Sequence, residues 1–328
     1  MLAARIHEDG GPEVVRVEDA PDPVAGPGEV LVRLRAASMN HLDVWVRKGL
    51  PSVPKPRILG ADGAGMVEAL GDGVSGLSVG QRVVINPGIV HGDRVTVVGE
   101  HFDGTHAELI AIAAEQVFPL DEGISFETAA AFPLVFETAY RMLVTREAIR
   151  HGNWALIWGI GGGVATAAFE ICRAFGVKTI VTSGSPEKLA TAREWGADIV
   201  LNHHEDDVAK AVKEATGAGV DVVVETVGEA TWARSLAAVR PLGRVVVCGA
   251  TTGPNPPAQL HRLWWKQLTV MGSTMGTRED FLGAYELVRD GRVHVRVDRV
   301  FPLVEAAAAH ARMEAGEQLG KIVLTIPG

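Results

Sequence analysis

Cysteine is scarce in this sequence, with only Cys172 and Cys248 among 328 residues. Two cysteines make neither a disulfide framework nor, by themselves, a metal site, so a reducing compartment is the simplest expectation. No apolar run approaches the ~18 residues that a membrane-spanning helix needs. The first residues, MLAARIHEDGG, lack the long apolar segment of a secretory signal peptide. We therefore expect a cytoplasmic protein without a membrane partner.

An excess of basic residues is also missing, because the formal net charge is −9. That balance argues against a general role in binding nucleic acids or membrane surfaces. Apolar residues make up 47% of the chain, which is enough for large hydrophobic cores. A length of 328 residues exceeds the usual single domain, so two domains are expected.

The most informative stretch of the sequence is a short apolar run, a glycine-rich turn and an apolar helix-like segment. The run Trp154–Trp158 is bounded by Gly and reads as a buried strand, and Val164–Phe175 is apolar on nearly every face. The glycines between them are Gly159, Gly161, Gly162 and Gly163. Strand, glycine-rich turn and helix form the context of a dinucleotide-binding fingerprint, in which a pyrophosphate meets the N-terminus of the helix.

The third glycine of that fingerprint has two candidate positions. It falls on Val164 or, with one extra residue in the turn, on Ala165. We take Ala165, because alanine still permits close packing of the helix on the strand.

Strand and helix signals alternate from Trp154 onward. Six strand signals occur, at Trp154–Trp158, Lys178–Thr182, Asp198–Leu201, Val220–Glu225, Gly243–Cys248 and Gln267–Met271. Helical segments are predicted between them, including one from Glu205 to Thr216. This alternation predicts an α/β fold with a doubly wound parallel sheet, that is, a Rossmann domain.

The first 122 residues follow a different pattern, with short Val-, Ile- and Leu-rich strands separated by Gly and Pro turns. Helices are predicted at Ser125–Phe132 and Glu137–Ile149, with Pro133 between them. We therefore place a β-rich domain at residues 1–122 and 277–328 and the cofactor-binding domain at residues 123–276.

Motifs along most of the chain resemble the medium-chain dehydrogenase/reductase superfamily. They include NHLDVWVRKG, LGADGAGMVEALGDGV, TAAAFPLVFETAY, VETVG and LGKIVL. The resemblance implies a GroES-like β-rich domain, an inserted Rossmann domain, and a homodimer or homotetramer that pairs through the edge of the Rossmann sheet at Val270–Ser273.

The resemblance also bears on metals. The zinc alcohol dehydrogenases of the superfamily hold a catalytic zinc at positions that here look like Asn40, Ala61 and Leu134, which is not a normal ligand set. Their four-cysteine structural zinc lobe has no counterpart here. Both zinc sites are thus expected to be absent, and the chain resembles the zinc-free quinone oxidoreductases and related enone reductases. A tyrosine that some quinone reductases carry soon after R-x-G is missing.

The implied activity is an NADPH-dependent oxidoreductase that delivers hydride to a quinone or an α,β-unsaturated carbonyl, a small-molecule substrate. Two alternatives stay open: an alcohol dehydrogenase-like enzyme acting on alcohols and aldehydes, and a nucleotide-binding protein without turnover. The candidate catalytic residues are Asn40, His41 and Asp43. Asn40 is a candidate hydrogen-bond donor to a carbonyl oxygen that gains charge, His41 a proton donor or a structural histidine, and Asp43 a functional or structural carboxylate.

The end of the second strand argues for NADPH. It carries Ser183, Gly184 and Ser185 with Lys188 one turn on, and no carboxylate to bond both ribose hydroxyls. Serine hydroxyls and a lysine can instead bind a 2′-phosphate, while Glu187 faces the first helical turn. The cofactor-binding candidates are Thr138, Gly159, Gly161, Gly162, Gly163, Val164, Ser183, Gly184, Ser185, Lys188, Asn202, Thr226, Gly249, Ala250, Ser273, Thr274 and Lys321.

Other histidines and tryptophans have two interpretations each. His91, His101 and His106 form either a rebuilt metal site or, as we expect, a set of solvated loop histidines. His203-His204 either flank the adenine or are surface residues. Trp264-Trp265 either line a substrate pocket or serve domain or subunit packing.

Overall fold

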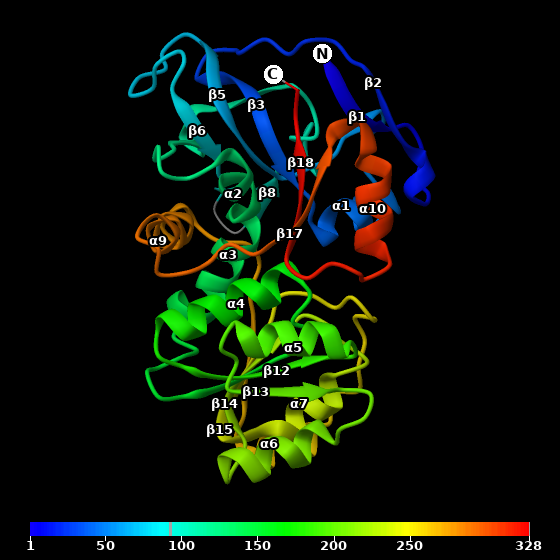
Figure 1. Cartoon of the computed structure of the whole chain (residues 1–328), viewed down its shortest axis with the longest axis vertical. Coiled ribbons are helices and arrows are strands. Elements are labelled where there is room, and N and C mark those ends of the chain that lie inside the picture. The colour runs from blue at the N-terminus through cyan, green and yellow to red at the C-terminus, as the bar shows by residue number, and fades with distance from the viewer. Residues whose placement is uncertain (92–93, 328) are drawn as a thin grey trace. The chain divides into compact units, whose positions relative to one another are not determined.

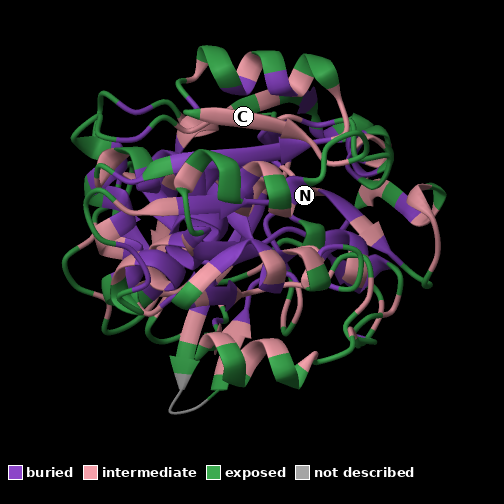
Figure 2. Ribbon diagram, turned by 90° about the horizontal axis from the view of Figure 1, so that it is seen from below, coloured by how far each residue is buried: buried purple, intermediate pink, exposed green. Residues whose placement is uncertain are grey.

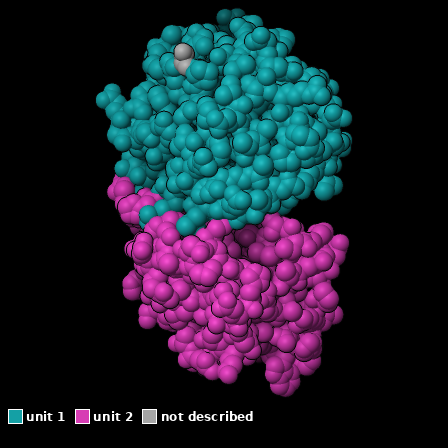
Figure 3. All heavy atoms as spheres, turned by 45° about the vertical axis from the view of Figure 1, so that its right-hand side comes forward, with its two compact units in different colours: residues 1–134, 277–289, 295–328 teal, residues 135–276, 290–294 magenta. Residues whose placement is uncertain are grey.

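The computed structural model describes residues 1–91 and 94–327, without the side chain of His91. The chain forms two compact units, coloured separately in Figure 3. Unit 1 comprises residues 1–134, 277–289 and 295–328, and unit 2 comprises residues 135–276 and 290–294. Among the described residues, we find no helix that combines the length and the apolar character of a membrane span.

Unit 1 is β-rich, as the sequence predicts. Its strands are β1 (Leu2–Ile6), β2 (Val15–Asp19), β3 (Glu29–Ser38), β4 (Arg57–Ile58), β5 (Asp62–Leu70), β6 (Arg82–Ile85), β7 (Gly88–His91), β8 (Arg94–Val97), β9 (Leu109–Ala113), β10 (Val117–Pro119), β17 (Val297–Pro302) and β18 (Lys321–Thr325). The largest sheet has the order β10-β6-β5-β3-β18-β17, with β9 also paired to β3. β3 alternates buried and half-buried residues, the period of a strand with one face in the core.

The strand β18 ties the C-terminal segment into this sheet. It pairs antiparallel with β3 and parallel with β17, so residues from both ends of the chain share one core (Figure 1). The helices of unit 1 are α1 (His41–Arg47), α2 (Phe126–Ala131), α9 (Arg278–Arg289) and α10 (Ala306–Glu314), while α3 (Pro133–Tyr140) begins in unit 1 and continues into unit 2. A GroES-like β-rich arrangement is thus confirmed.

Unit 2 holds the predicted parallel sheet. Its strands are β11 (Trp154–Ile157), β12 (Lys178–Ser183), β13 (Ile199–Asn202), β14 (Val220–Glu225), β15 (Val239–Val247) and β16 (Thr269–Gly272). The spatial order is β13-β12-β11-β14-β15-β16, and every neighbouring pair is parallel. This is the strand order 3-2-1-4-5-6 of a doubly wound Rossmann sheet, so the predicted fold class is confirmed.

Helices connect the strands of unit 2. They are α4 (Gly163–Ala174), α5 (Pro186–Glu194), α6 (Val208–Thr216), α7 (Trp232–Ala238) and α8 (Leu260–Lys266). Strand residues such as Leu156, Ile180 and Val223 are fully buried between helices, which explains their continuous apolar character. Figure 2 colours the strands of the sheets mostly as buried, whereas many helices carry exposed residues on one side.

Several boundaries differ from those predicted. Helix α6 begins at Val208 with Asp207 as its N-cap, not at Glu205, because Asn202 closes a tight turn. Two helices do meet at Pro133, since α2 ends at Ala131 and Pro133 is the first residue of α3. The second one starts earlier than the predicted Glu137, and its π-helical continuation ends at Thr145 rather than Ile149. Residues 123–134, assigned above to the cofactor domain, lie in unit 1.

Candidate active site and cofactor site

The cofactor candidates of unit 2 collect at one edge of its sheet. Because parallel strands point the same way, their carboxyl ends share that edge, where ligands of doubly wound folds bind. The candidates that end these strands or follow them within two residues are Gly159, Ser183, Asn202, Thr226, Gly249 and Ser273, one for each strand. The fold therefore brings together residues that are scattered over more than a hundred positions of sequence.

The glycine turn after β11 has the backbone that the fingerprint requires. Gly159 has φ +65°, a conformation that favours glycine, and Gly162 is the N-cap of the helix α4. Ala165 is buried in the first turn of that helix, where its small side chain permits close packing. The N-terminus of a helix of this length offers backbone N–H groups and partial positive charge to a pyrophosphate.

The end of β12 is more crowded than the sequence suggests. Ser185 is the N-cap of α5 and its Oγ accepts a hydrogen bond from the Lys188 backbone N–H. The same hydroxyl donates to Glu187 Oε2 at 2.7 Å, which lowers the pKa of that carboxyl. Ser183 Oγ in turn accepts from the Ser185 N–H at 3.1 Å. The Glu187 carboxylate therefore lies closer to this turn than the sequence alone indicates.

Two buried hydroxyls of unit 2 are available for hydrogen bonds to a ligand. Thr138 Oγ1 and Ser273 Oγ are buried and have no hydrogen-bond partner among the described residues. Both were cofactor candidates from the sequence, and buried hydroxyls without partners are costly unless a ligand or water satisfies them. Together with the glycine turn, they are compatible with a bound dinucleotide.

A buried carboxylate supports the loop after β14. Glu225 Oε1 accepts from the N–H groups of Val227 and Gly228 and from Thr231, and Oε2 accepts from Ser235 Oγ at 2.5 Å. Ser235 also accepts from the indole of Trp158, at the end of β11. This network fixes the loop that carries Thr226. The sequence interpretation missed this role of Glu225. The acidic residue of the V-E-T-V-G motif is the signal that could have revealed it.

In unit 1, the catalytic candidate Asn40 belongs to a buried ionic cluster. Lys321 Nζ lies 2.7 Å from Asn40 Oδ1 and 3.0 Å from Asp62 Oδ2, and Asn40 Nδ2 donates to Asp62 Oδ2 at 2.9 Å. Asp62 is fully buried and also accepts from Ser38 Oγ and from the Leu134 N–H. Lys321 was predicted among the cofactor-binding residues, but its ammonium is bonded to Asn40 and Asp62.

The other two catalytic candidates differ in environment. Both oxygens of Asp43 accept backbone hydrogen bonds, from Asn40 and Gly60, while desolvation raises the pKa of its carboxyl. These bonds fit the structural interpretation of Asp43. His41 begins α1 and is exposed, with its ring edge-on to Trp45. Partial desolvation and the Lys48 ammonium lower the pKa of His41, so its imidazole is predominantly neutral at pH 7.

The expectation of solvated loop histidines is wrong for His106. Its side chain is fully buried, 6.2 Å from the ring of His310, because the backbone around it is hydrogen-bonded to Ala4 and Leu59. His101 is exposed and accepts from the Val97 N–H. The side chain of His91 lies outside the described residues. Within the described part of the chain, no three His, Cys, Asp or Glu side chains are placed to hold a metal ion.

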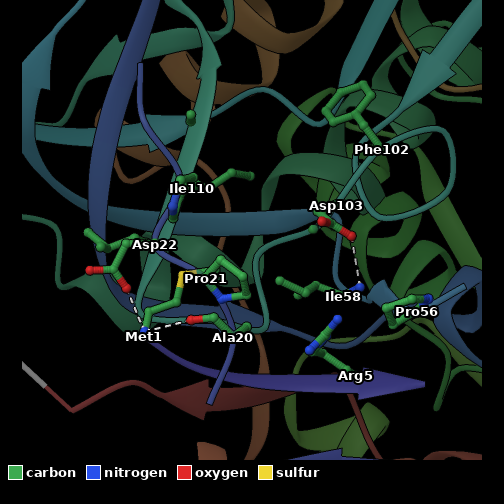
Figure 4. A pocket seen from close by; sticks show the side chains of 14 residues that line it. Met1, Arg5, Ala20, Pro21, Asp22, Pro56, Ile58, Phe102, Asp103 and Ile110 are labelled. Carbon is green, nitrogen blue, oxygen red and sulfur yellow. Dashed lines mark hydrogen bonds and ion pairs between the residues drawn. The ribbon is translucent and has the colours of Figure 1, made fainter. Parts of the chain in front are cut away.

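A surface pocket of about 500 Å³ opens elsewhere in unit 1, beside Ile58 and Phe102 (Figure 4). Its charged groups are already engaged: the N-terminal ammonium with Asp22, Asp103 with the Ile58 N–H, and Arg5 with Glu18. None of the site residues predicted from the sequence lines it. We do not regard this pocket as the candidate active site.

Comparison with known proteins agrees with both units. Residues 26–122 match a family model described as an alcohol dehydrogenase GroES-like domain, and residues 163–290 one described as a zinc-binding dehydrogenase. The chain is 36% identical over 326 residues to a quinone oxidoreductase from Pseudomonas aeruginosa, with 96% of each chain covered. The chain belongs to the medium-chain dehydrogenase/reductase superfamily.

Solved structures of this superfamily match along the whole chain. A crystal structure described as an NAD-dependent alcohol dehydrogenase is 39% identical, with a TM-score of 0.96 and full coverage of both chains. A mycobacterial protein complexed with NADPH is 30% identical, with a TM-score of 0.87, 99% of this chain covered and 100% of the other. As a medium-chain dehydrogenase/reductase, this protein is an oxidoreductase that uses a pyridine nucleotide and a small-molecule substrate.

Proposed function

We propose that this medium-chain dehydrogenase/reductase is a zinc-independent, NADPH-dependent reductase of quinones or α,β-unsaturated carbonyl compounds. The observation that carries the proposal is the Lys321 ammonium, held by Asn40 and Asp62. A fixed internal cation beside a catalytic candidate supplies positive charge where related zinc enzymes use a metal. A second cation at the same oxygens would be repelled by the ammonium.

Asn40 is the proposed donor to the substrate oxygen. Its Oδ1 accepts from the ammonium, which polarises the amide, and its Nδ2 carries two hydrogens, one of which is directed to Asp62. We assign the second hydrogen to the carbonyl oxygen that gains negative charge during reduction. A reduced nicotinamide supplies a hydride to an electrophilic carbon when it is bound. A proton from solvent, delivered directly or relayed through the His41 imidazole, then completes the reduced product.

The substrate class is tested by following NADPH absorbance against a panel of 1,4-quinones, enones and alkenals, with alcohols plus oxidised cofactor as the comparison. Oxidation of NADPH by quinones or enones is the expected outcome. Activity confined to alcohols and aldehydes would favour the alcohol dehydrogenase-like alternative. Tight binding of NADPH without turnover on any compound would favour the non-catalytic alternative.

Zinc content is a separate prediction. Protein purified without a His tag is expected to contain well under one zinc per chain by elemental analysis, because Asn40, Ala61 and Leu134 stand at the family's ligand positions. Stoichiometric zinc would contradict the zinc-independent mechanism even if NADPH turnover were observed.

Cofactor preference is predicted to reside at the end of β12. We expect NADPH to bind about tenfold more tightly than NADH, since one partly exposed charge-assisted hydrogen bond contributes at the lower end of ~1.5–3 kcal/mol. Replacing Ser183 with Asp should reverse the preference by repelling the 2′-phosphate and accepting from the 2′-hydroxyl. The measurement is fluorescence titration of both cofactors.

A matched control is Asn153→Asp. It adds the same charge to unit 2 at the opposite, amino-terminal edge of the sheet, where Asn153 Oδ1 accepts from the Arg150 N–H. This variant should keep the wild-type preference. If wild type binds NADH as tightly as NADPH, and Ser183→Asp leaves that ratio unchanged, the end of β12 does not select the cofactor.

Association of two copies is proposed through the open edge of the unit 2 sheet. β16 is the last strand, and unpaired strand edges favour pairing with another chain. Large apolar side chains are exposed on β15, β16 and α8, a helix with no buried residue. The exposed ones are Leu242, Leu260, Trp264, Trp265 and Val270, and Trp265 is 75% exposed. This supports the packing interpretation of Trp264-Trp265.

The variant Trp265→Glu with Val270→Lys is expected to be monomeric, because it places charges on this apolar surface. Wild type should scatter light as a dimer or tetramer at micromolar concentration. Val24, which is 84% exposed on unit 1, offers a matched control, and Val24→Lys should leave the assembly intact. A monomeric wild type would count against the proposed interface.

A further inference from the structure

The two histidines after β13 lie against the turn that ends β12. A Cβ atom added at Gly184 would lie 2.4 Å from His204 Nε2 and 3.3 Å from His203 Nε2. Both imidazole edges therefore approach the one residue between Ser183 and Ser185. Those two serines are the residues proposed above to select the cofactor, so the histidines share their environment.

The turn from Asn202 to Asp206 holds the histidines in place. Asn202 Oδ1 accepts from the His204 N–H, and Asp206 Oδ2 accepts from the Asn202 N–H. The backbone N–H of His203 donates to the Ser183 carbonyl, and its ring nitrogen Nδ1 lies 3.3 Å from Thr182 Oγ1. The turn is thus fastened to β12 by backbone and side-chain contacts, and the predicted cofactor residue Asn202 acts by shaping it.

Charged side chains of both signs surround this edge of the sheet. The Ser185 hydroxyl is engaged with Glu187, so it is not the simple phosphate donor that the sequence suggests. Lys188 lies in the same helical turn. Arg234, from α7, donates to the His203 and Ala230 carbonyls. The turn itself contributes the acidic side chains of Glu205 and Asp206.

We propose that His204, in its protonated form, binds the 2′-phosphate of NADPH, which makes the discrimination between NADPH and NADH depend on pH. This inference rests on the proposed use of NADPH. The rings of His203 and His204 have their centroids 4.6 Å apart, so both are not readily protonated together. Desolvation, His204 and Arg234 lower the pKa of His203. His204 is the exposed member of the pair, so its ring is open to a ligand.

Histidine changes charge between about pH 5 and pH 8, and a neighbouring phosphate dianion favours the imidazolium. Lowering the pH from about 8.5 to about 6.5 should therefore strengthen NADPH binding while the phosphate, with a second pKa of about 6, stays mostly doubly charged. NADH lacks this phosphate, so its affinity should change little over the same interval.

The test is fluorescence titration of NADPH and NADH at both pH values, with the wild type and His204→Gln, His204→Arg and His151→Gln. His151 is the matched control: it is exposed and packs against Gly176 in the same way, but before the first strand of the sheet. The ratio of NADH to NADPH dissociation constants in wild type and His151→Gln is expected to rise about threefold to tenfold on acidification.

His204→Gln should lose this rise, retaining only the titration of the phosphate itself, whereas His204→Arg should show a high ratio at both pH values. A rise of equal size in His204→Gln and wild type, or no rise in wild type, overturns the proposal while NADPH binding itself stands. Failure of both cofactors to bind wild type overturns the proposed function and this inference with it. Far-UV circular dichroism of each variant confirms that the fold is retained.

Discussion

Replacing Lys321 with methionine is expected to lower the free energy of unfolding by about 3–5 kcal/mol, because it leaves a buried carboxylate without its cation. Asp62 has no exposed surface and Lys321 is 2% exposed, so neither charge can be hydrated without opening the β-rich unit. The measurement is urea unfolding of wild type and Lys321→Met at neutral pH.

A double variant separates the ion pair from the packing around it. Lys321→Met combined with Asp62→Asn removes both charges while an amide keeps part of the hydrogen bonding, so its loss of stability should be much smaller than the sum of the two single losses. Lys55→Met is the matched control, since Lys55 pairs with the exposed Asp9. That pair should contribute about 0.2–1 kcal/mol. Equal losses at the two lysines would contradict the buried ion pair.

Mild acid is expected to destabilise the β-rich unit strongly. His310 is fully buried, and neither ring nitrogen has a partner among the described residues. Desolvation first, then His106 and Arg47, hold the pKa of His310 well below 6.5, and desolvation also lowers the pKa of His106 against the opposing effect of Asp43. Since the unfolded chain binds these protons more readily, stability is full above about pH 6.5 and falls as the pH decreases.

Two such histidines should together cost at most about 2 kcal/mol between pH 6.5 and pH 5.5. The raised pKa of the Asp43 carboxyl has the opposite effect on stability. It lowers the free energy of unfolding as the pH rises above 3.8, the ordinary pKa of this group. His310→Leu should lose about half as much stability over the same interval, and His261→Gln, at an exposed histidine, as much as wild type. Urea unfolding at both pH values measures the difference. The same acid loss in His310→Leu and wild type would exclude His310 as its source.

The parts of the fold that local signals encode were predictable from the sequence. The strand Trp154–Ile157, the glycine turn and the N-cap Ser185 each depend on neighbours within a few residues, and each was found near its predicted position. Boundaries failed where tertiary contacts decide them. The β15 strand, for example, begins at Val239 because it pairs there with Val220.

The site was less predictable, because its residues meet across long sequence separations. Asn40 and Lys321 were both singled out, for different roles, yet their hydrogen bond joins residues 281 positions apart. His106 was expected to be solvated because its neighbours are loop residues, and only the pairing of its backbone with Leu59 and Ala4 reveals its burial. The approach of His204 to Gly184 depends likewise on the packing of two parallel strands.

The central claim is that this medium-chain dehydrogenase/reductase reduces conjugated carbonyl compounds with NADPH and without zinc. The most direct test measures, in one chelator-dialysed preparation, its zinc content and its steady-state oxidation of NADPH by a 1,4-quinone. We expect turnover at a zinc content far below one per chain, unchanged when zinc is added back. Turnover that disappears on dialysis and returns in proportion to added zinc would contradict it.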